Sequence, residues 1–434
     1  MSSLSMIGPR ITELHITPIA ITDPPLLNAA GMHAPYALRT VIELITSDGI
    51  SGLSEIPGNT EIDRALRSAK KCIINKDPFQ LNLIRDDLKT LFGEDVPRGE
   101  APWDQRKLVH VFSAFEVACL DIIGKITSRP VFDLLGGKQR DKVPFTAYLF
   151  YKREGAGGVL GFGNEPRATD WNRARQRPAL EPVGIVDQAL AMCESYGFQS
   201  IKLKGGVFPP DEEVKAILAL HEQFGREMPL RFDPNAVWSL ETALKFGKRM
   251  KPHLEYLEDP VRGQIQMATL RKHLQVPIAT NMCTTSFADL PQSFRLASED
   301  IILSDHHFWG GLRASMSLAG ICEIFDRKLS MHSNTHLGIS LAAMVHLGAA
   351  LPTLPYALDT HYPWQSEEII KGGRFEFIDG ALPVAEEPGL GIELDREKLE
   401  ELHQNYLHCG LTERDDEAEM RKLNPNWRFS QTRW

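Results

Sequence analysis

The sequence predicts an α/β fold whose larger part is a parallel (β/α) barrel, and two observations carry this prediction. From about residue 143 onward, short apolar runs that end in a polar residue alternate with helical stretches. Eight such runs occur within about 220 residues, which is the number of strands that a parallel barrel requires. The chain has 434 residues, so it is long enough to hold a barrel and a further domain.

The first third of the chain mixes strand and helix patterns. Ile11–Ile21 alternates apolar and polar residues, and Leu38–Glu55 predicts two strands around a turn at Ser47-Asp48-Gly49. Helical periodicity then follows at Asp63–Ile74, Asn82–Leu91 and Lys107–Ile126. Strands that are followed by helices indicate an α+β unit rather than alternating βα units.

The barrel elements are predicted next along the chain. The strand candidates are Phe145–Tyr148, Ser200–Lys204, Leu230–Asp233, Tyr256–Glu258, Ile278–Asn281, Ile301–Asp305, Leu329–His332 and Tyr356–Asp359. The clearest helices between them are Val183–Tyr196, Asp211–Phe224, Leu240–Met250, Gly311–Arg327 and Ile339–Ala349. Lys152–Pro182 is too long for an ordinary loop, and is either a functional excursion over the barrel mouth or a mobile lid. After Gly372 the pattern is irregular, with one helix at Arg396–His408.

Composition excludes several other classes of protein. The 48 Lys and Arg residues against 57 Asp and Glu residues give a net charge of −9, which argues against nucleic-acid binding and against binding to an anionic membrane. No apolar run approaches the roughly 20 residues that span a bilayer, and Met1–Arg10 lacks the pattern of a signal peptide. The six cysteines show no CxxC spacing. We therefore expect a cytoplasmic enzyme with reduced thiols.

Six polar residues end consecutive strand candidates: Lys204, Asp233, Glu258, Asn281, Asp305 and His332. Neighbours in this series are separated by 23 to 29 residues. One βα unit, with its strand, helix and two loops, spans roughly 24 residues. The six side chains should therefore surround the C-terminal mouth of one barrel, where barrel enzymes place their chemistry.

Asp233, Glu258 and Asn281 offer three oxygen donors from three consecutive strands. Oxygen ligands that include two carboxylates suit Mg²⁺, whereas zinc usually takes Cys or His. The alternative is that each residue caps the helix after its strand, as Asp and Asn often do. Three such residues on consecutive strands favour the metal site.

Two further pairs suggest bases on either side of that site. Lys202 and Lys204 point to the same face of their strand, and their mutual repulsion should lower the pKa of at least one of them. The alternative is an exposed edge strand with two solvated lysines, against which Gly205-Gly206 argues, because it lets the chain turn tightly. Asp305 and His332 stand on adjacent strands, where the carboxylate would orient the imidazole. The alternative is that each of these two residues has only a structural role, as a helix cap or as a hydrogen-bonded core histidine.

Two bases that flank a hard cation suggest removal of a proton next to a carboxylate. The cation would neutralise the carboxylate oxygens as the enediolate forms. This combination of a Lys or His base with Mg²⁺ is the arrangement described for the enolase superfamily.

At these residues the chain resembles the enolase superfamily and, within it, the glucarate dehydratase group. The matching barrel motifs are Lys202-Leu203-Lys204-Gly205-Gly206, Asp233-Pro234-Asn235, Glu258-Asp259-Pro260, Ala279-Thr280-Asn281-Met282, Asp305 with His307-Phe308-Trp309, and His332-Ser333-Asn334. Outside them, the matching positions are Asn28, Gly31-Met32-His33-Ala34-Pro35, Tyr148-Leu149-Phe150, Asp359-Thr360-His361 and Arg414-Asp415-Asp416. The resemblance runs from about residue 10 to the C-terminus.

The resemblance implies a (β/α)7β TIM-like barrel with an α+β N-terminal capping domain that the C-terminal segment completes. We assign residues 1–140 to the cap, 141–372 to the barrel and 373–434 to the returning segment. It also implies a homo-oligomer.

The resemblance further implies roles for individual residues. Asp233, Glu258 and Asn281 would hold Mg²⁺. Lys204 would be the base on one face, tuned by Lys202, which would also contact the substrate carboxylate, and His332, oriented by Asp305, the base on the other. The substrate contacts would be Asn28, His33, Tyr148, Asn235, Ser333, Asn334, His361 and Arg414.

The group dehydrates D-glucarate, and often L-idarate, to 5-dehydro-4-deoxy-D-glucarate. This chain departs from its pattern at Pro102-Trp103-Asp104, where the group has a Thr-Phe-Asp run, in a shorter loop after Pro260, and at His306, which replaces a proline. Activity on another acid sugar, epimerisation without dehydration, and a catalytically silent relative therefore stay open as alternatives.

Overall fold

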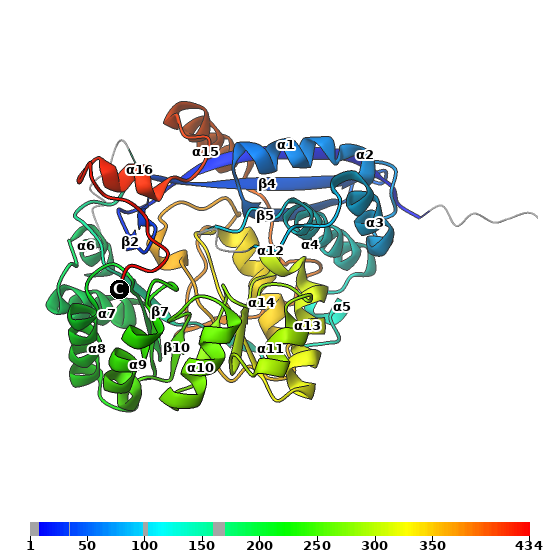
Figure 1. Cartoon of the computed structure of the whole chain (residues 1–434). Helices are drawn as coiled ribbons and strands as arrows, with labels where there is room; N and C mark the ends of the chain where they lie inside the picture. The colour runs from blue at the N-terminus through cyan, green and yellow to red at the C-terminus, as the bar shows by residue number, and fades with distance from the viewer. Residues whose placement is uncertain (1–7, 34, 99–102, 159–169) are drawn as a thin grey trace, which may run out of the picture.

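A curled parallel sheet forms the centre of the lower half of the molecule in Figure 1. The computed structural model describes residues 8–33, 35–98, 103–158 and 170–434. In these residues, seven parallel strands lie in the order β13-β12-β11-β10-β9-β8-β7. Their bounds are β7 (Ala147–Phe150), β8 (Ile201–Lys204), β9 (Leu230–Asp233), β10 (Tyr256–Glu258), β11 (Ile278–Thr280), β12 (Ile301–Ser304) and β13 (Lys328–Met331).

The eighth strand candidate, Tyr356–Asp359, is a bridge and not a strand of this sheet. Its Leu358 carbonyl accepts the Thr146 N–H at 2.9 Å, and its Asp359 N–H donates to the Met331 carbonyl at 3.1 Å. The segment therefore joins both edges of the curled sheet. The predicted TIM-like barrel is confirmed, with this bridge in the eighth position. Because the residues just before β7 pair with Leu358, the first strand begins two residues later than predicted.

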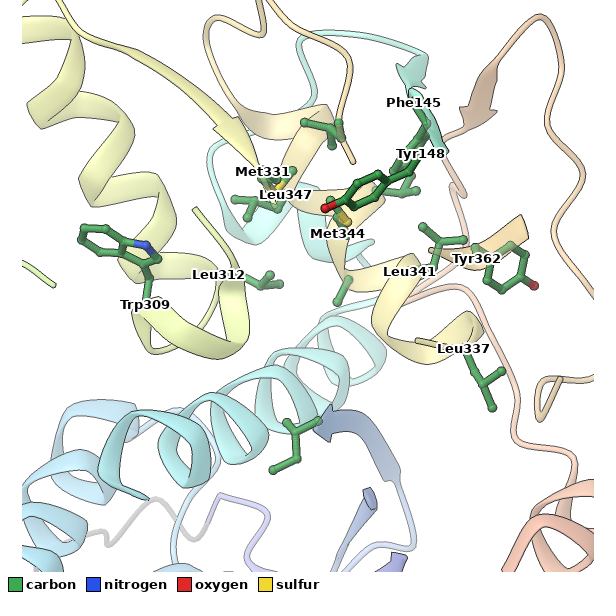
Figure 2. Close-up of a cluster of buried hydrophobic side chains, with 14 of the residues drawn as sticks. Phe145, Tyr148, Trp309, Leu312, Met331, Leu337, Leu341, Met344, Leu347 and Tyr362 are labelled. Carbon is green, nitrogen blue, oxygen red and sulfur yellow. The ribbon is translucent and has the colours of Figure 1, made fainter. Parts of the chain in front are cut away.

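Helices follow the strands of the barrel. They are α7 (Pro182–Tyr196), α8 (Pro210–Phe224), α9 (Leu240–Met250), η1 (Lys251–His253), α10 (Gln264–Leu274), α11 (Leu290–Leu296), α12 (His306–Trp309), α13 (Leu312–Ile324) and α14 (Gly338–Ala350). The sequence pattern missed α10 to α12; α11 and α12 are too short to show a clear helical period. In Figure 2, Leu341, Met344 and Leu347 of α14 belong to the same buried cluster as Met331 of β13.

A second unit lies above the barrel in Figure 1 and contains the three-stranded antiparallel sheet β1-β4-β5. Its strands are β1 (Ile11–Thr22), β2 (Leu27–Asn28), β3 (Gly31–Met32), β4 (Tyr36–Thr46) and β5 (Ser51–Pro57). Its helices are α1 (Thr60–Ser68), α2 (Lys70–Ile73), α3 (Leu81–Phe92), α4 (Lys107–Thr127) and α5 (Val131–Leu134). The predicted hairpin around Ser47-Asp48-Gly49 is present, and the capping domain is confirmed as an α+β unit.

The C-terminal segment returns to the cap in Figure 1, where α15 (Arg396–Cys409) lies against β1 and α16 (Asp416–Arg421) lies against β3. After η2 (Tyr362–Trp364), the chain forms β14 (Ala381–Pro383), which pairs with β6 (Lys142–Pro144), and then α15 and α16. Two helices therefore follow residue 372, not one. Near the chain end, Arg433 donates to the Gly206 carbonyl of the barrel at 3.1 Å and to the Ala29 carbonyl of the cap at 2.7 Å.

Four features of the sequence lie at least partly outside the described residues: the first seven residues of Met1–Arg10, Ala34 of Gly31-Met32-His33-Ala34-Pro35, Pro102, and residues 159–169 of Lys152–Pro182. The described part of Lys152–Pro182 contains the short helix α6 (Asp170–Gln176). The boundaries at residues 140 and 372 stay predictions. In the part of the chain that the structure describes, we find no helix with both the length and the apolar character needed to cross a membrane.

Two buried glutamates of the cap hold the N-termini of barrel helices. Glu116 of α4 accepts the Leu312 N–H at the start of α13 at 2.9 Å. Glu55 of β5 accepts the N–H groups of Leu337 and Ser340 at the start of α14, at 2.9 and 3.1 Å. The first N–H groups of a helix lack partners within the helix, and a carboxylate there also complements the helix dipole. These contacts fix the cap over the two helices that flank β13.

We expect a Gly52→Ala substitution to destabilise the cap, because a Cβ there would lie 2.1 Å from the Ala118 carbonyl oxygen of α4. Crowding of this kind typically lowers the free energy of unfolding by about 1–3 kcal/mol. The matched control is Gly320→Ala in α13, where a Cβ meets nothing within 4 Å, and which should stabilise by about 0.4–1 kcal/mol. Thermal melting measures both changes. Equal melting temperatures for Gly52→Ala and the unmodified protein would contradict the packing described here.

Candidate active site

A pocket lies between the cap and the C-terminal ends of the barrel strands. Its lining residues are Asn28, His33, Arg98, Trp103, Asp104, Tyr148, Phe150, Lys204, Asn235, Asn281, Met282, Phe308, His332, Ser333, Asn334, His361 and Arg414. All eight predicted substrate contacts are among them, together with three of the six strand-end residues. Lys202, Asp233, Glu258 and Asp305 are buried and do not border the pocket. The structure therefore gathers the predicted site residues at one end of the barrel.

Strand β8 directs Lys202 and Lys204 into the barrel, and every residue of this strand is buried. The chain then turns at Gly206, whose φ is +73°, and a Cβ there would lie 2.4 Å from the Pro234 carbonyl oxygen. Only glycine tolerates both conditions without strain. The tight turn that was expected after this strand is therefore present, and the exposed edge strand is excluded.

Lys202 lies between two carboxylates. Its Nζ is 2.6 Å from Glu258 Oε2 and 2.6 Å from Asp359 Oδ2, and it also lies 4.7 Å from the centre of the Tyr148 ring. Burial opposes the charge on this lysine, but the attraction of Asp359 and Glu258 outweighs burial and raises the pKa of Lys202 well above its ordinary value. Mutual repulsion with Lys204 is therefore not the dominant influence on Lys202, and the side chain stays charged.

Lys204 reaches the pocket and pairs with Asp233, at 2.7 Å between Nζ and Oδ2. Burial favours the protonated form of Asp233, yet Lys204 and Lys202 together lower the pKa of this carboxyl. The other Asp233 oxygen accepts the Asn235 N–H at 2.8 Å. Lys204 is therefore the lysine of the pair that a ligand in the pocket can meet.

The oxygen donors of Asp233, Glu258 and Asn281 fit a hard cation. Glu258 Oε1 is buried without a hydrogen-bond partner among the described residues. Burial, together with the nearby charges of Asp233 and Asp359, raises the pKa of Glu258 well above its ordinary value. Asn281 borders the pocket, and its backbone N–H donates to Asp259 at 2.8 Å. A buried carboxylate oxygen without a hydrogen-bond partner, next to further oxygen ligands, is the environment that Mg²⁺ would satisfy.

A second group of possible ligand atoms belongs to Asp305, His306 and His307, whose atoms lie within 4.8 Å of one another. The nitrogens of His307 already contact Asp305 Oδ1 at 2.7 Å and the Glu55 carbonyl at 3.0 Å. We therefore interpret this group as a hydrogen-bond network and not as a metal site.

His332 follows β13, borders the pocket, and retains 12% side-chain exposure. Its Nδ1 lies 3.2 Å from Asp305 Oδ2. Burial disfavours ionisation of Asp305, but His307 and His332 lower the pKa of its carboxyl well below the ordinary value. The ionised carboxylate accepts, so Nδ1 of His332 carries the proton and Nε2 is free to act as a base. Asp305 also caps α12, so the simple helix-cap interpretation is correct as well.

Lys204 and His332 approach the pocket from different sides of the barrel, since four strands lie between β8 and β13 in the sheet. A molecule in the pocket can thus meet a cationic amine on one side and an imidazole on the other. Between these strands lie the ends of β9, β10 and β11 with the three oxygen donors. This arrangement can move a proton on either face of a substrate that is held by its oxygens.

Several polar residues of the pocket wall are already hydrogen-bonded to other residues. Arg414 donates to both oxygens of Asp416, at 2.7 and 2.8 Å, and lies over the Trp103 ring at 3.9 Å. Asn28 donates to the same Asp416 at 2.6 Å. On the barrel side, Ser333 Oγ lies 2.9 Å from His361 Nδ1. The cap, the barrel and the C-terminal segment therefore all contribute to one wall.

The sequence patterns missed several residues of the site. Arg98 and Trp103 line the pocket from an irregular part of the cap, where no periodicity marks them. Asp359 contacts Lys202, and a signal for it existed, since it follows His332 by 27 residues and so continues the spacing of the strand-end series.

Comparison with known proteins adds independent findings. The sequence model of a family described as "Enolase C-terminal domain-like" matches residues 184–398. The chain is 46% identical to a protein named "Probable glucarate dehydratase" from Streptomyces coelicolor, over 96% of this chain and 97% of that protein.

Solved structures of similar chains share the whole fold. An enolase from Mycobacterium smegmatis in complex with formate and acetate is 47% identical, with a TM-score of 0.92 and coverage of 100% of both chains. An enolase from Pseudomonas fluorescens with bound magnesium, potassium and tartrate is 43% identical, with a TM-score of 0.90, over 98% of this chain and 100% of that chain.

We expect the imidazole of His332 to be mostly neutral at pH 6.5. Burial lowers its pKa below the ordinary value of 6.5, and the attraction of Asp305 offsets only part of this effect. Titration of histidine-labelled protein by ¹H–¹³C NMR, with His332→Asn to assign the signal, should give a midpoint below 6.5. Asp305→Asn removes the group that raises the pKa, so it should move the midpoint lower still. A midpoint above 6.5 in the unmodified protein would show that Asp305 outweighs burial.

Proposed function

This chain belongs to the enolase superfamily, and we propose that it is a Mg²⁺-dependent acid-sugar dehydratase that acts on D-glucarate and L-idarate. The observation that carries the proposal is the pocket that both Lys204 and His332 line, from strands on either side of β9, β10 and β11. The 46% identity to a protein named as a probable glucarate dehydratase supports the reaction type.

Asp233, Glu258 and Asn281 would hold Mg²⁺. When bound, the ion supplies electrostatic stabilisation of the negative charge that develops on the substrate carboxylate. The buried and unpartnered Glu258 oxygen supports this assignment, as does the bound magnesium in the P. fluorescens relative. Lys202 does not border the pocket, but it keeps a positive charge 2.6 Å from the carboxylate of Glu258 and so influences the electrostatics of the proposed ion site.

The two bases would divide the proton transfers between the faces of the substrate. On one face, Lys204 removes the proton next to the carboxylate once its own proton has left. On the other, the free Nε2 of His332 removes it, while Asp305 holds Nδ1. A protonated His332 can also deliver a proton to the β-hydroxyl, so that the C–O bond breaks and water leaves. The enol that remains becomes the 2-keto acid.

The polar residues around the bases support a dicarboxylate substrate. Arg414 uses its Nε and one Nη for Asp416, which leaves the other Nη for a substrate oxygen. His33, Tyr148, Asn235 and Asn334 add donors around the same space, and Asn28, Ser333 and His361 complete the set. The tartrate bound in the P. fluorescens relative is a small hydroxylated dicarboxylate.

A panel of hexarates and aldonates, assayed with Mg²⁺ for 2-keto acid, tests the proposal. We expect turnover of D-glucarate and L-idarate that disappears with a chelator, and Glu258→Gln should weaken Mg²⁺ binding in calorimetry. If only other acid sugars gave product, the proposed substrates would be wrong and the proposed reaction type would be right. Deuterium exchange from D₂O without keto acid would indicate an epimerase, and Mg²⁺ binding with neither exchange nor product would indicate a silent relative.

Substitution of either base should remove proton abstraction on one face of the substrate. We expect His332→Asn and Lys204→Gln each to lower the rate of proton abstraction on its own substrate face by about 10²–10⁴, the usual contribution of a positioned base. Each variant should abolish α-deuterium exchange for one of the two epimers and leave exchange for the other, which mass spectrometry can measure. The control is Lys328→Gln, which removes an exposed lysine at the start of β13. If both variants lost α-deuterium exchange equally for both epimers, the assignment of one base to each substrate face would be wrong.

A further inference from the structure

Asp305 is held by more groups than His332 alone. Its Oδ2 accepts from His332 Nδ1 and from Asn334 Nδ2, both at 3.2 Å. Its Oδ1 accepts from the backbone N–H and the ring Nδ1 of His307, at 2.9 and 2.7 Å. The contact with the His307 ring is the shortest of the four. His307 therefore has the strongest geometric hold on the carboxylate that orients His332.

The other side of the His307 ring faces the cap. Its Nε2 lies 3.0 Å from the carbonyl oxygen of Glu55 in β5 and 3.1 Å from Ser340 Oγ in α14. The side chain of the same Glu55 accepts N–H groups at the start of α14. Only 3% of the His307 side chain is exposed, so it cannot exchange these partners for water. The ring thus connects the cap sheet to Asp305.

We propose that His307 is a positioning residue for His332: its Nδ1–H fixes the plane of the Asp305 carboxylate, while its Nε2 side places the ring against strand β5 of the cap, beside Ser340 Oγ. Asp305 is ionised and can only accept, so Nδ1 of His307 must donate, whichever protons its other nitrogen carries. The inference rests on the proposed function only in that His332 is taken to be a base. Because Lys204 has a different partner, His307 should affect one substrate face and not the other.

Two substitutions separate the two contacts of the ring. The amide of His307→Asn can place an N–H where Nδ1 lies, and so keeps the Asp305 contact and loses the Glu55 contact. The amide of His307→Gln reaches the position of Nε2, and so keeps the Glu55 contact and loses the Asp305 contact. A role in packing alone would affect the two variants alike.

The first measurement is α-deuterium exchange with D-glucarate and L-idarate, where the epimer whose exchange His332→Asn abolishes defines the His332 face. We expect His307→Gln to lower exchange on that face about 10- to 100-fold, as for loss of one hydrogen bond to a charged group. The same variant should leave exchange on the Lys204 face unchanged. His307→Asn should leave exchange unchanged on both faces. Equal rates on the His332 face for His307→Gln and the unmodified protein would overturn the proposal.

The second measurement does not depend on activity, so it distinguishes failure of this inference from failure of the proposed function. Crystal structures of the two variants should show the Asp305–His332 contact kept with Asn and lost with Gln, even if no acid sugar is turned over. A retained contact in His307→Gln would overturn the proposal. If neither variant folds, ¹⁵N NMR of the unmodified protein decides, because the proposal requires a proton on Nδ1 of His307, and a bare Nδ1 would overturn it.

Discussion

The charge balance around Lys202 is the interaction on which the barrel interior depends. Its ammonium group lies 2.6 Å from both Glu258 and Asp359, and all three side chains are buried. Removing one member of such a group leaves an uncompensated buried charge, which typically costs about 3–5 kcal/mol. The contact also joins β8 and β10 to the segment that closes the barrel, so the closure of the fold and the electrostatics of the site have the same cause. Arg231 extends the network, with Nε 2.6 Å from Glu255 and Nη1 4.0 Å from Asp359.

The cap is joined to the barrel on the side that carries His332. Glu116 and Glu55 hold the first turns of α13 and α14, and His307 contacts the backbone of the same Glu55. Because β13 lies between these helices in the chain, the position of the cap and the position of the imidazole are set by the same buried contacts. The pocket is thus formed by two units whose relative position is determined by hydrogen bonds at helix ends.

The two groups that face the pocket have different surroundings. Lys204 pairs with Asp233, one of the three oxygen donors, so a cation held by that carboxylate would lie close to this lysine. His332 pairs with Asp305, which belongs to a separate network and is shared with His307. The two side chains that face the pocket therefore have different carboxylate partners. Among the departures from the family pattern, Trp103 lies against Arg414 and the His306 ring lies 3.9 Å from that of His307, so both affect the surroundings of the pocket and neither touches the three oxygen donors.

The sequence by itself determined the barrel and the ring of Lys204, Asp233, Glu258, Asn281, Asp305 and His332. This was possible because one βα unit has a nearly constant length, so a regular spacing along the chain becomes adjacency around the barrel. The spacing also predicted that these residues share one end of the fold. The tail and cap contacts to the pocket came from the family resemblance and not from any periodicity.

Tertiary structure alone decided which of these side chains reach the pocket. Lys202 is two residues from Lys204 and on the same face, yet it is covered by Glu258 and Asp359 and does not border the pocket. Only the structure shows that Tyr356–Asp359 closes the barrel as a bridge, that Arg98 and Trp103 line the wall, and that Asp305 serves two imidazoles. These features depend on contacts between segments far apart in the chain, and such contacts leave no local pattern in the order of the residues.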